Sequence, residues 1–282
     1  MAEAEFKEKI IAFIDVLGFK KLVEATEAGS GMALSDLVEL LKNLGSPDER
    51  NKFAKHGPKL CPQSKYLQRD LDFRLTQISD CAILSSEVSP AGVINLIERC
   101  WVSVISLLQS GIMCRGYITR GLILHTDTQL LGTGYQKACE KEKMVAAFKR
   151  QADERGTPFV EVDRSICAYV TSCQDPCVKE MFSRFTKDDG EAVALFPFQR
   201  LAHSFVVAGF GLKFDPEKEK RSNNNVRLRI EHFKERVMAF VDTSNASAVR
   251  KAEHYITALD TQLSLCDKTD EMIDLITSPL RA

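Results

Sequence analysis

The sequence predicts an α+β fold, in which helices cover one face of a mainly antiparallel sheet. Residues 10–14 are all apolar and form a run short enough to be a central strand buried on both faces. The segments that follow, up to Asp163, alternate in the order β-α-α-β-β-α-β-β-α-β. This order predicts a ferredoxin-like, palm-type domain over residues 1–163, followed by an α-rich C-terminal extension over residues 164–282.

Each expected element has a local signal. Apolar residues spaced three and four apart over 34–41 predict an amphipathic helix, and Ser89 followed by Pro90 marks the start of a long one. The other elements expected in the first domain are a helix over 19–27, a strand pair over 71–78 and 81–84, a strand pair over 112–120 and 121–125, a helix over 135–148 and a strand over 157–163. Residues 45–65 have no clean period and are expected to form an insertion or mobile loop over the site.

The extension carries a different pattern. We expect helices near 164–172 and 176–185, short strands near 193–196 and 205–210, and two closing helices over 226–242 and 246–266. Residues 216–225 are highly charged and rich in Asn, which predicts an exposed linker. The extension as a whole is expected to pack on the first domain and to aid dimerisation.

Composition excludes several classes of protein. With 282 residues, of which 44% are hydrophobic, the chain can bury a large core, and its net charge of -1 argues against a nucleic-acid partner. Its nine cysteines form no CxxC pair, which favours reduced core residues over disulfides or zinc. No purely apolar run approaches the ~20 residues of a membrane span, and the N-terminus is charged, so we expect a cytoplasmic protein without a membrane partner. The five histidines show no metal or triad spacing.

Two aspartates are the candidate catalytic groups. Asp15 ends the buried run and is followed by a turn into a helix, where backbone amides can hold a phosphate. Asp80 follows Ser79 at a predicted hairpin tip. Two carboxylates brought together on neighbouring strands are the layout of a two-metal nucleotidyl-transfer site, which would hold two Mn²⁺ or Mg²⁺ ions. The alternative is that both residues only cap a helix or stabilise a turn.

Three motifs resemble class III nucleotidyl cyclases over about residues 8–163: Phe13-Ile-Asp15-Val-Leu-Gly18-Phe19, Ser79-Asp80, and Gly132-x-Gly134 to Ala138. The resemblance implies that Asp15, Asp80 and the Val16 carbonyl bind the metal ions. It also implies a head-to-tail homodimer whose active sites lie between the subunits. The substrate-binding residues it implies are Phe13, Val16, Leu17, Gly18, Phe19, Thr76, Gln129, Gln136 and Lys137.

Departures from the family pattern concern the base and the phosphates. Thr76 and Gln129 stand where purine cyclases carry a Lys and an Asp that read the base, and Gln136 and Glu140 replace the transition-state Asn and Arg. Gln136 can still hydrogen-bond the ribose, whereas Glu140 cannot bind phosphate. The positive charge must come from another residue, and the candidates are Arg115, which we place in the catalytic set, Arg120, Lys137 and Lys141.

A cyclase that keeps both metal aspartates and loses the purine readers resembles the pyrimidine cyclases of Pycsar antiphage defence. The resemblance implies conversion of UTP to 3′,5′-cyclic UMP and pyrophosphate, as a second messenger for a separate effector that the enzyme does not bind directly. One alternative is cyclic CMP made from CTP. Another is a different palm enzyme, such as a diguanylate cyclase relative or a polymerase. The third is a degenerate cyclase fold that only binds a nucleotide or a partner.

Overall fold

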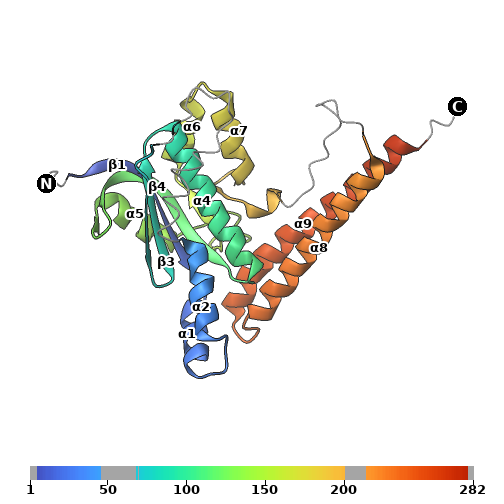
Figure 1. Ribbon diagram of the computed structural model, residues 1–282, viewed down its shortest axis with the longest axis horizontal. Helices are drawn as coiled ribbons and strands as arrows, with labels where there is room; N and C mark the ends of the chain where they lie inside the picture. Colours follow the sequence, from blue (N-terminus) through green and yellow to red (C-terminus); the bar gives the residue numbers. More distant parts are fainter. Residues whose placement is uncertain (1–4, 46–67, 69, 201–213, 279–282) are drawn as a thin grey trace. The chain divides into compact units, whose positions relative to one another are not determined.

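A computed structural model describes residues 5–45, 68, 70–200 and 214–278 (Figure 1). The chain folds as two compact units, Met1–Phe196 and Pro197–Ala282. Residues 164–196 therefore belong to the first unit, although we expected the first domain to end at Asp163. Whether catalysis needs only residues 1–163 stays a prediction.

A central strand, β1 (Lys7–Val16), organises the sheet of the first unit. It pairs in antiparallel fashion with β3 (Cys81–Glu87) on one side and with β4 (Cys114–His125) on the other. The strand order is β2-β3-β1-β4-β6-β8-β7, and β5 pairs with β4 off this path. The remaining strands are β2 (Arg74–Ile78), β5 (Leu130–Leu131), β6 (Val160–Val162), β7 (Thr186–Asp188) and β8 (Val193–Leu195). The part β2-β3-β1-β4 has the ferredoxin-like order, and the predicted α+β class is confirmed.

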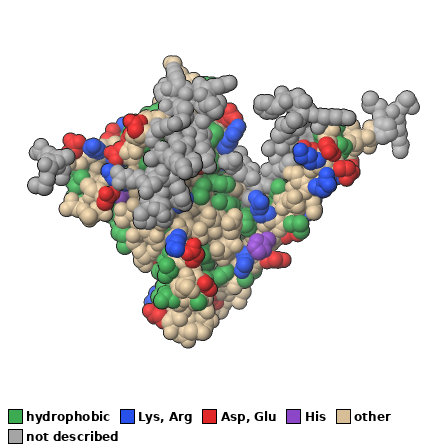
Figure 2. Space-filling model, in the orientation of Figure 1, with side chains coloured by type: hydrophobic (Ala, Val, Ile, Leu, Met, Phe, Trp, Pro, Cys, Tyr) green, Lys and Arg blue, Asp and Glu red, His purple; other side chains and the backbone are tan. Residues whose placement is uncertain are grey.

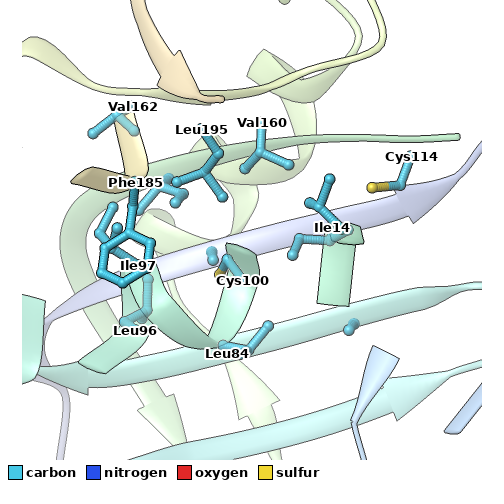
Figure 3. Close-up of a cluster of buried hydrophobic side chains, with 14 of the residues drawn as sticks. Ile14, Leu84, Leu96, Ile97, Cys100, Cys114, Val160, Val162, Phe185 and Leu195 are labelled. Atoms are coloured by element: carbon cyan, nitrogen blue, oxygen red, sulfur yellow. The ribbon is translucent and has the colours of Figure 1, made fainter. Parts of the chain in front are cut away.

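The larger core lies on one face of this sheet. Alternate residues of β1, among them Ile10 and Ile14, are fully buried against the long helix α4 (Pro90–Gln109) (Figure 3). Ser89 caps α4 by accepting a hydrogen bond from the Gly92 amide, as its position before Pro90 predicts. The same core includes residues of α2 (Leu34–Leu41), η1 (Lys42–Leu44), α6 (Arg164–Ser172) and α7 (Pro176–Phe185), and α1 (Phe19–Glu27) packs against it.

Helix α5 (Thr133–Glu142) covers the opposite face, which differs from the expectation of helices on one face only. Its Ala138 packs against Ile11 and Phe13, the β1 residues that point away from α4. Two glycines permit this close packing, because a Cβ atom on Gly121 would lie 2.7 Å from the Cα atom of Gly134. Asp15 follows the alternation of Ile11 and Phe13, so the candidate site lies on the α5 face.

Helix α4 is long and apolar enough to span a membrane by length and composition. Most of its residues are nevertheless buried inside the first unit, where they contact β1 and β3. The apolar character of α4 is therefore explained by its place in the core.

Two elements of the first unit differ from their expected bounds. The strand pair expected around Arg120 and Gly121 is a single strand, β4, because Gly121 serves the contact with α5 and makes no turn. Helix α5 ends at Glu142, before the expected end at Phe148. Most of the loop expected over 45–65 and all of the strand expected over 205–210 lie outside the described residues.

The second unit is built on two long helices, α8 (Pro216–Phe240) and α9 (Ala246–Thr277), with the short η2 (Pro197–Arg200) before them (Figure 1). The prediction of an exposed linker over 216–225 is wrong, since these residues form the first turns of α8. Pro216 occupies the first turn, and the Asp215 side chain accepts a hydrogen bond from the Lys218 amide.

Polar contacts explain why so charged a segment is helical. Asn223 is fully buried, and its Nδ2 atom donates to the Cys266 carbonyl and to Asp270 Oδ1, each at 2.7 Å. Arg227 forms ion pairs with Asp267 and Asp270. Acidic and basic side chains are interspersed along these helices (Figure 2). The partners come from α9, at least 40 positions further along the chain, so the local composition could not reveal them.

Candidate metal and nucleotide site

The two aspartates converge. Asp15, near the end of β1, pairs in register with Cys81, the first residue of β3, and Asp80 lies in the turn that precedes Cys81. One ligand atom from each of Asp15, Asp80 and Cys81 lies within 4.8 Å of the others, and all three residues are half-buried. Ser79 adopts a left-handed conformation with φ 54°, which shapes the tight β2–β3 turn. The predicted convergence of Asp15 and Asp80 is thus confirmed.

Backbone hydrogen bonds fix the turn against β1. The Val16 amide donates to the Asp80 carbonyl at 3.1 Å, and the Leu17 amide donates to the Met113 carbonyl at 2.9 Å. These two amides are therefore engaged by the protein, which leaves those of Gly18 and Phe19 as the candidates for phosphate contact at the start of α1. In an antiparallel ladder the N–H and C=O of one residue point to the same side, so the Val16 carbonyl faces the Asp80 turn.

Charge crowding characterises this cluster. Burial raises the pKa of the Asp15 carboxyl, and the nearby negative charges of Glu142 and Asp80 raise it further. Burial also raises the pKa of the Cys81 thiol, as does its hydrogen bond to Asp15, so this group stays protonated. A divalent cation would relieve the repulsion between the carboxylates.

The donor set fits a hard divalent cation. Two carboxylates and the Val16 carbonyl supply oxygen ligands, which suit Mg²⁺ and Mn²⁺, whereas a protonated thiol is a weak ligand. Cys81 was not among the residues expected here. The only signal in the sequence is its position directly after Asp80, which places it opposite Asp15 once the register is known.

Of the four candidate cations, Arg115 lies nearest to the aspartates. It pairs in register with Asp15 across β1 and β4, and its Nε atom donates to Glu142 at the end of α5. Arg120 forms two hydrogen bonds with Glu8, and Lys137 forms an ion pair with Asp163 at 2.6 Å. Lys141 is exposed on α5. Any role of Lys137 in binding substrate stays a prediction.

The two residues at the base-reading positions, Thr76 and Gln129, lie near the same end of β4, and Gln136 stands at the position of the transition-state Asn. Thr76 Oγ1 lies 2.9 Å from Nε2 of His125, whose Nδ1 atom lies 2.9 Å from Ser85 Oγ. Gln129 is exposed in the turn after β4, and Gln136 is exposed on α5. A contact of these side chains with a base or ribose stays a prediction.

His125 is a buried polar residue that the sequence did not mark. It is 6% exposed, and burial lowers the pKa of its imidazole to about 4, helped by the positive charges of Lys9 and Arg74. The ring is therefore neutral near pH 7, and each ring nitrogen has a hydroxyl partner.

The two aromatic residues of the first motif contact the two cores. Phe13 is buried on the α5 face, where its ring centroid lies 6.4 Å from that of Tyr135. Phe19 packs against the larger core. Both therefore have a packing role, and a contact with substrate stays a prediction.

Comparisons with known proteins give matches among solved structures. No protein-family model and no curated protein matches the chain. Among solved structures, the chain is similar to the catalytic core of a rhodopsin-guanylyl cyclase with converted specificity, in complex with ATPαS, at 11% identity. The match has a TM-score of 0.31 and covers 67% of this chain and 92% of that one.

Proposed function

We propose that the protein is a metal-dependent nucleotide cyclase whose reaction takes place at Asp15 and Asp80. The observation that carries the proposal is the convergence of these carboxylates with Cys81, with ligand atoms within 4.8 Å of one another. The ferredoxin-like order of β2, β3, β1 and β4 supports it, since the palm-type layout places its two carboxylates on neighbouring strands.

In the proposed reaction, the ribose 3′-oxygen forms a bond to the α-phosphorus while the bond to the pyrophosphate oxygen breaks. The proton of the 3′-hydroxyl passes to solvent. Two divalent cations, when bound, would lower the pKa of this hydroxyl and offset charge on the triphosphate. The chain's own residues hold and orient the reactants: Asp15, Asp80 and the Val16 carbonyl as metal ligands, and the amides of Gly18 and Phe19 with Arg115 as phosphate contacts.

We propose UTP as the substrate and cyclic UMP as the product, with CTP as the alternative. Support comes from Thr76 and Gln129, which stand where a purine cyclase carries Lys and Asp. The Thr76 hydroxyl is held by His125, which fixes a small polar group and cannot imitate a lysine. A homodimer, a cytoplasmic location, and antiphage signalling through a separate effector rest on the family resemblance and are proposed with it.

A second candidate function is nucleotide binding without turnover. It is favoured by one observation: the cation nearest to Asp15, Arg115, is already paired with the buried Glu142. Gln136 and Glu140, at the positions of the family's transition-state Asn and Arg, favour it as well.

The test is to incubate the purified chain with Mn²⁺ and each of the four ribonucleotides and to identify the products by mass. We expect a cyclic monophosphate from UTP or CTP, and its loss in Asp15→Asn and Asp80→Asn. Asp153→Asn, which changes an exposed aspartate, is the matched control. Product from ATP alone would overturn the base assignment, and a linear or dinucleotide product would favour another palm enzyme. Binding without turnover would establish the second candidate.

A further inference from the structure

We infer that Glu142 and the Gly156 carbonyl are positioning groups that hold the Arg115 guanidinium as the binding group for the terminal phosphates of the substrate. This inference rests on the proposed function, because it assumes that a triphosphate binds beside Asp15. It adds two residues that no sequence motif marked.

Strand register places Arg115 at the metal cluster. Arg115 is directly opposite Asp15 on the β1–β4 pair, as Cys81 is opposite Asp15 on the β1–β3 pair. Residues paired in this way point to the same face and have Cβ atoms about 5 Å apart. In keeping with this register, the guanidinium charge partly offsets the raised pKa of the Asp15 carboxyl.

Glu142 is an unusual residue at the end of α5. It is only 2% exposed, and its Oε1 atom accepts a hydrogen bond from Arg115 Nε. A carboxylate is rarely buried without a partner of opposite charge, and this pair leaves the other edge of the guanidinium available. This one hydrogen bond to Nε therefore orients Arg115 and uses neither of its two terminal amino groups, Nη1 and Nη2.

The chain at Gly156 supports the other side of the guanidinium. The Gly156 carbonyl lies 3.5 Å from Arg115 Nη1, at the outer limit of a hydrogen bond. Gly156 has φ +69°, and a Cβ atom at this position would lie 2.6 Å from Nη1. The backbone conformation therefore favours a glycine, and a side chain at this position would displace the guanidinium.

The remaining amino group, Nη2, is the free one. It donates to no acceptor among residues 5–45, 68, 70–200 and 214–278, and it is absent from the buried polar atoms of these residues that lack a partner. Nη2 is therefore accessible to solvent, and an anion can reach it. The other cations named above are held by Glu8 and Asp163 or lie exposed on α5.

The test measures binding of inorganic tripolyphosphate to the full chain in saturating Mg²⁺ by titration calorimetry. We expect Arg115→Met and Glu142→Ala each to weaken binding about tenfold, since each removes or misplaces one charged hydrogen-bond donor. The double variant should lose no more than Arg115→Met alone, because both act through one group. Glu142→Gln keeps an oxygen for Nε and should retain most of the affinity.

Matched controls and a second variant separate this role from a structural one. Glu140→Gln changes an exposed carboxylate on the same helix, and Arg164→Met changes an exposed arginine at the start of α6, so both should bind as the wild type does. Should Glu142→Ala fail to fold, Gly156→Ala displaces Nη1 from the other side and should show the same loss.

Two results would overturn the inference. One is unchanged or tighter tripolyphosphate binding in the folded Glu142→Ala or Gly156→Ala variant. The other is a loss that adds to that of Arg115→Met, which would show that Glu142 acts elsewhere. Failure of the proposed function is distinguishable, because a wild type that binds tripolyphosphate but turns over no nucleotide would contradict the cyclase reaction and leave the inference standing. A wild type that does not bind tripolyphosphate would contradict both.

Discussion

The Cys81 thiol donates a hydrogen bond to the Asp15 carboxylate across the β1–β3 pair, with an Sγ–Oδ1 distance of 3.1 Å. This bond favours the ionised carboxylate and opposes the effect of burial on its pKa. The thiol thus helps to keep Asp15 in the form that can bind a cation, although it is itself a poor ligand.

Replacing Cys81 should therefore shift the pH dependence of metal binding. In Cys81→Ala the donor is lost and the pKa of Asp15 rises further, so protons compete with Mn²⁺ up to a higher pH. Cys81→Ser keeps a donor and should bind as the wild type does. Calorimetric Mn²⁺ titrations at a series of pH values above the ordinary carboxyl pKa of about 4 would check this. Equal midpoints in the Ala and Ser variants would contradict it.

The ionised Asp15 should also lower the stability of the metal-free protein. Because its pKa is raised in the folded state, folding is favoured at pH values below the ordinary carboxyl pKa of about 4, and that contribution is lost as the pH rises through the raised value. Asp15→Asn should then raise Tm at pH 7 in EDTA, although it should abolish the proposed catalysis, and the gain should vanish near pH 3.5. Calorimetry beside Asp153→Asn would reveal it, and a lower Tm at pH 7 would count against it.

His125 should have the opposite effect under acid conditions. Its folded pKa is about 4, below the ordinary histidine value, so stability is fully present above about pH 6.5 and declines as the pH falls towards 4. Relative to His125→Gln, the wild type should lose up to about 3 kcal/mol of unfolding free energy over this interval. The measurement is urea unfolding of both proteins at a series of pH values. In the difference between their unfolding free energies, the contributions of the other titratable groups cancel. If the two plots of unfolding free energy against pH ran parallel, the pKa of the His125 ring would not be lowered by folding, and the prediction would be wrong.

The Gly121–Gly134 contact should be sensitive to a single methyl group. A Cβ atom on Gly134 would lie 2.4 Å from Ile11 Cδ1 and 2.9 Å from the Gly121 carbonyl carbon, so α5 would have to move off the sheet. Gly134→Ala should cost about 1–3 kcal/mol of stability, in spite of the better helix propensity of alanine. Because α5 carries Glu142, tripolyphosphate affinity should fall too. Thr133→Ala, at an exposed neighbour, is the control, and unchanged chemical denaturation in Gly134→Ala would refute the argument.

Sequence periodicity predicted the parts of the fold whose signals are local. The buried run at β1, the cap at Ser89 and the turn at Ser79 each specify their own conformation, and these elements form as expected. Gly121 was interpreted as a break and 216–225 as a linker, because their partners, Gly134 and Cys266, come from distant parts of the chain. Tertiary contacts decided both.

The candidate site divides in the same way. Asp15 and Asp80 could be predicted because each ends or interrupts a strand, and a carboxylate in that position is unusual. Glu142, Gly156 and His125 could not, since a glutamate at a helix end, a loop glycine and a lone histidine are common in any sequence. They become notable only once burial and the neighbouring groups are known.

The hydrogen bond between the Val16 amide and the Asp80 carbonyl joins the two acidic segments at the backbone. Folding therefore brings the two like charges together before any cation binds. An incoming cation meets a preformed site, in which the two carboxylates need not move. Cation binding to such a site should cost the protein little conformational entropy. The free energy of folding offsets the repulsion between the two carboxylates in the metal-free protein.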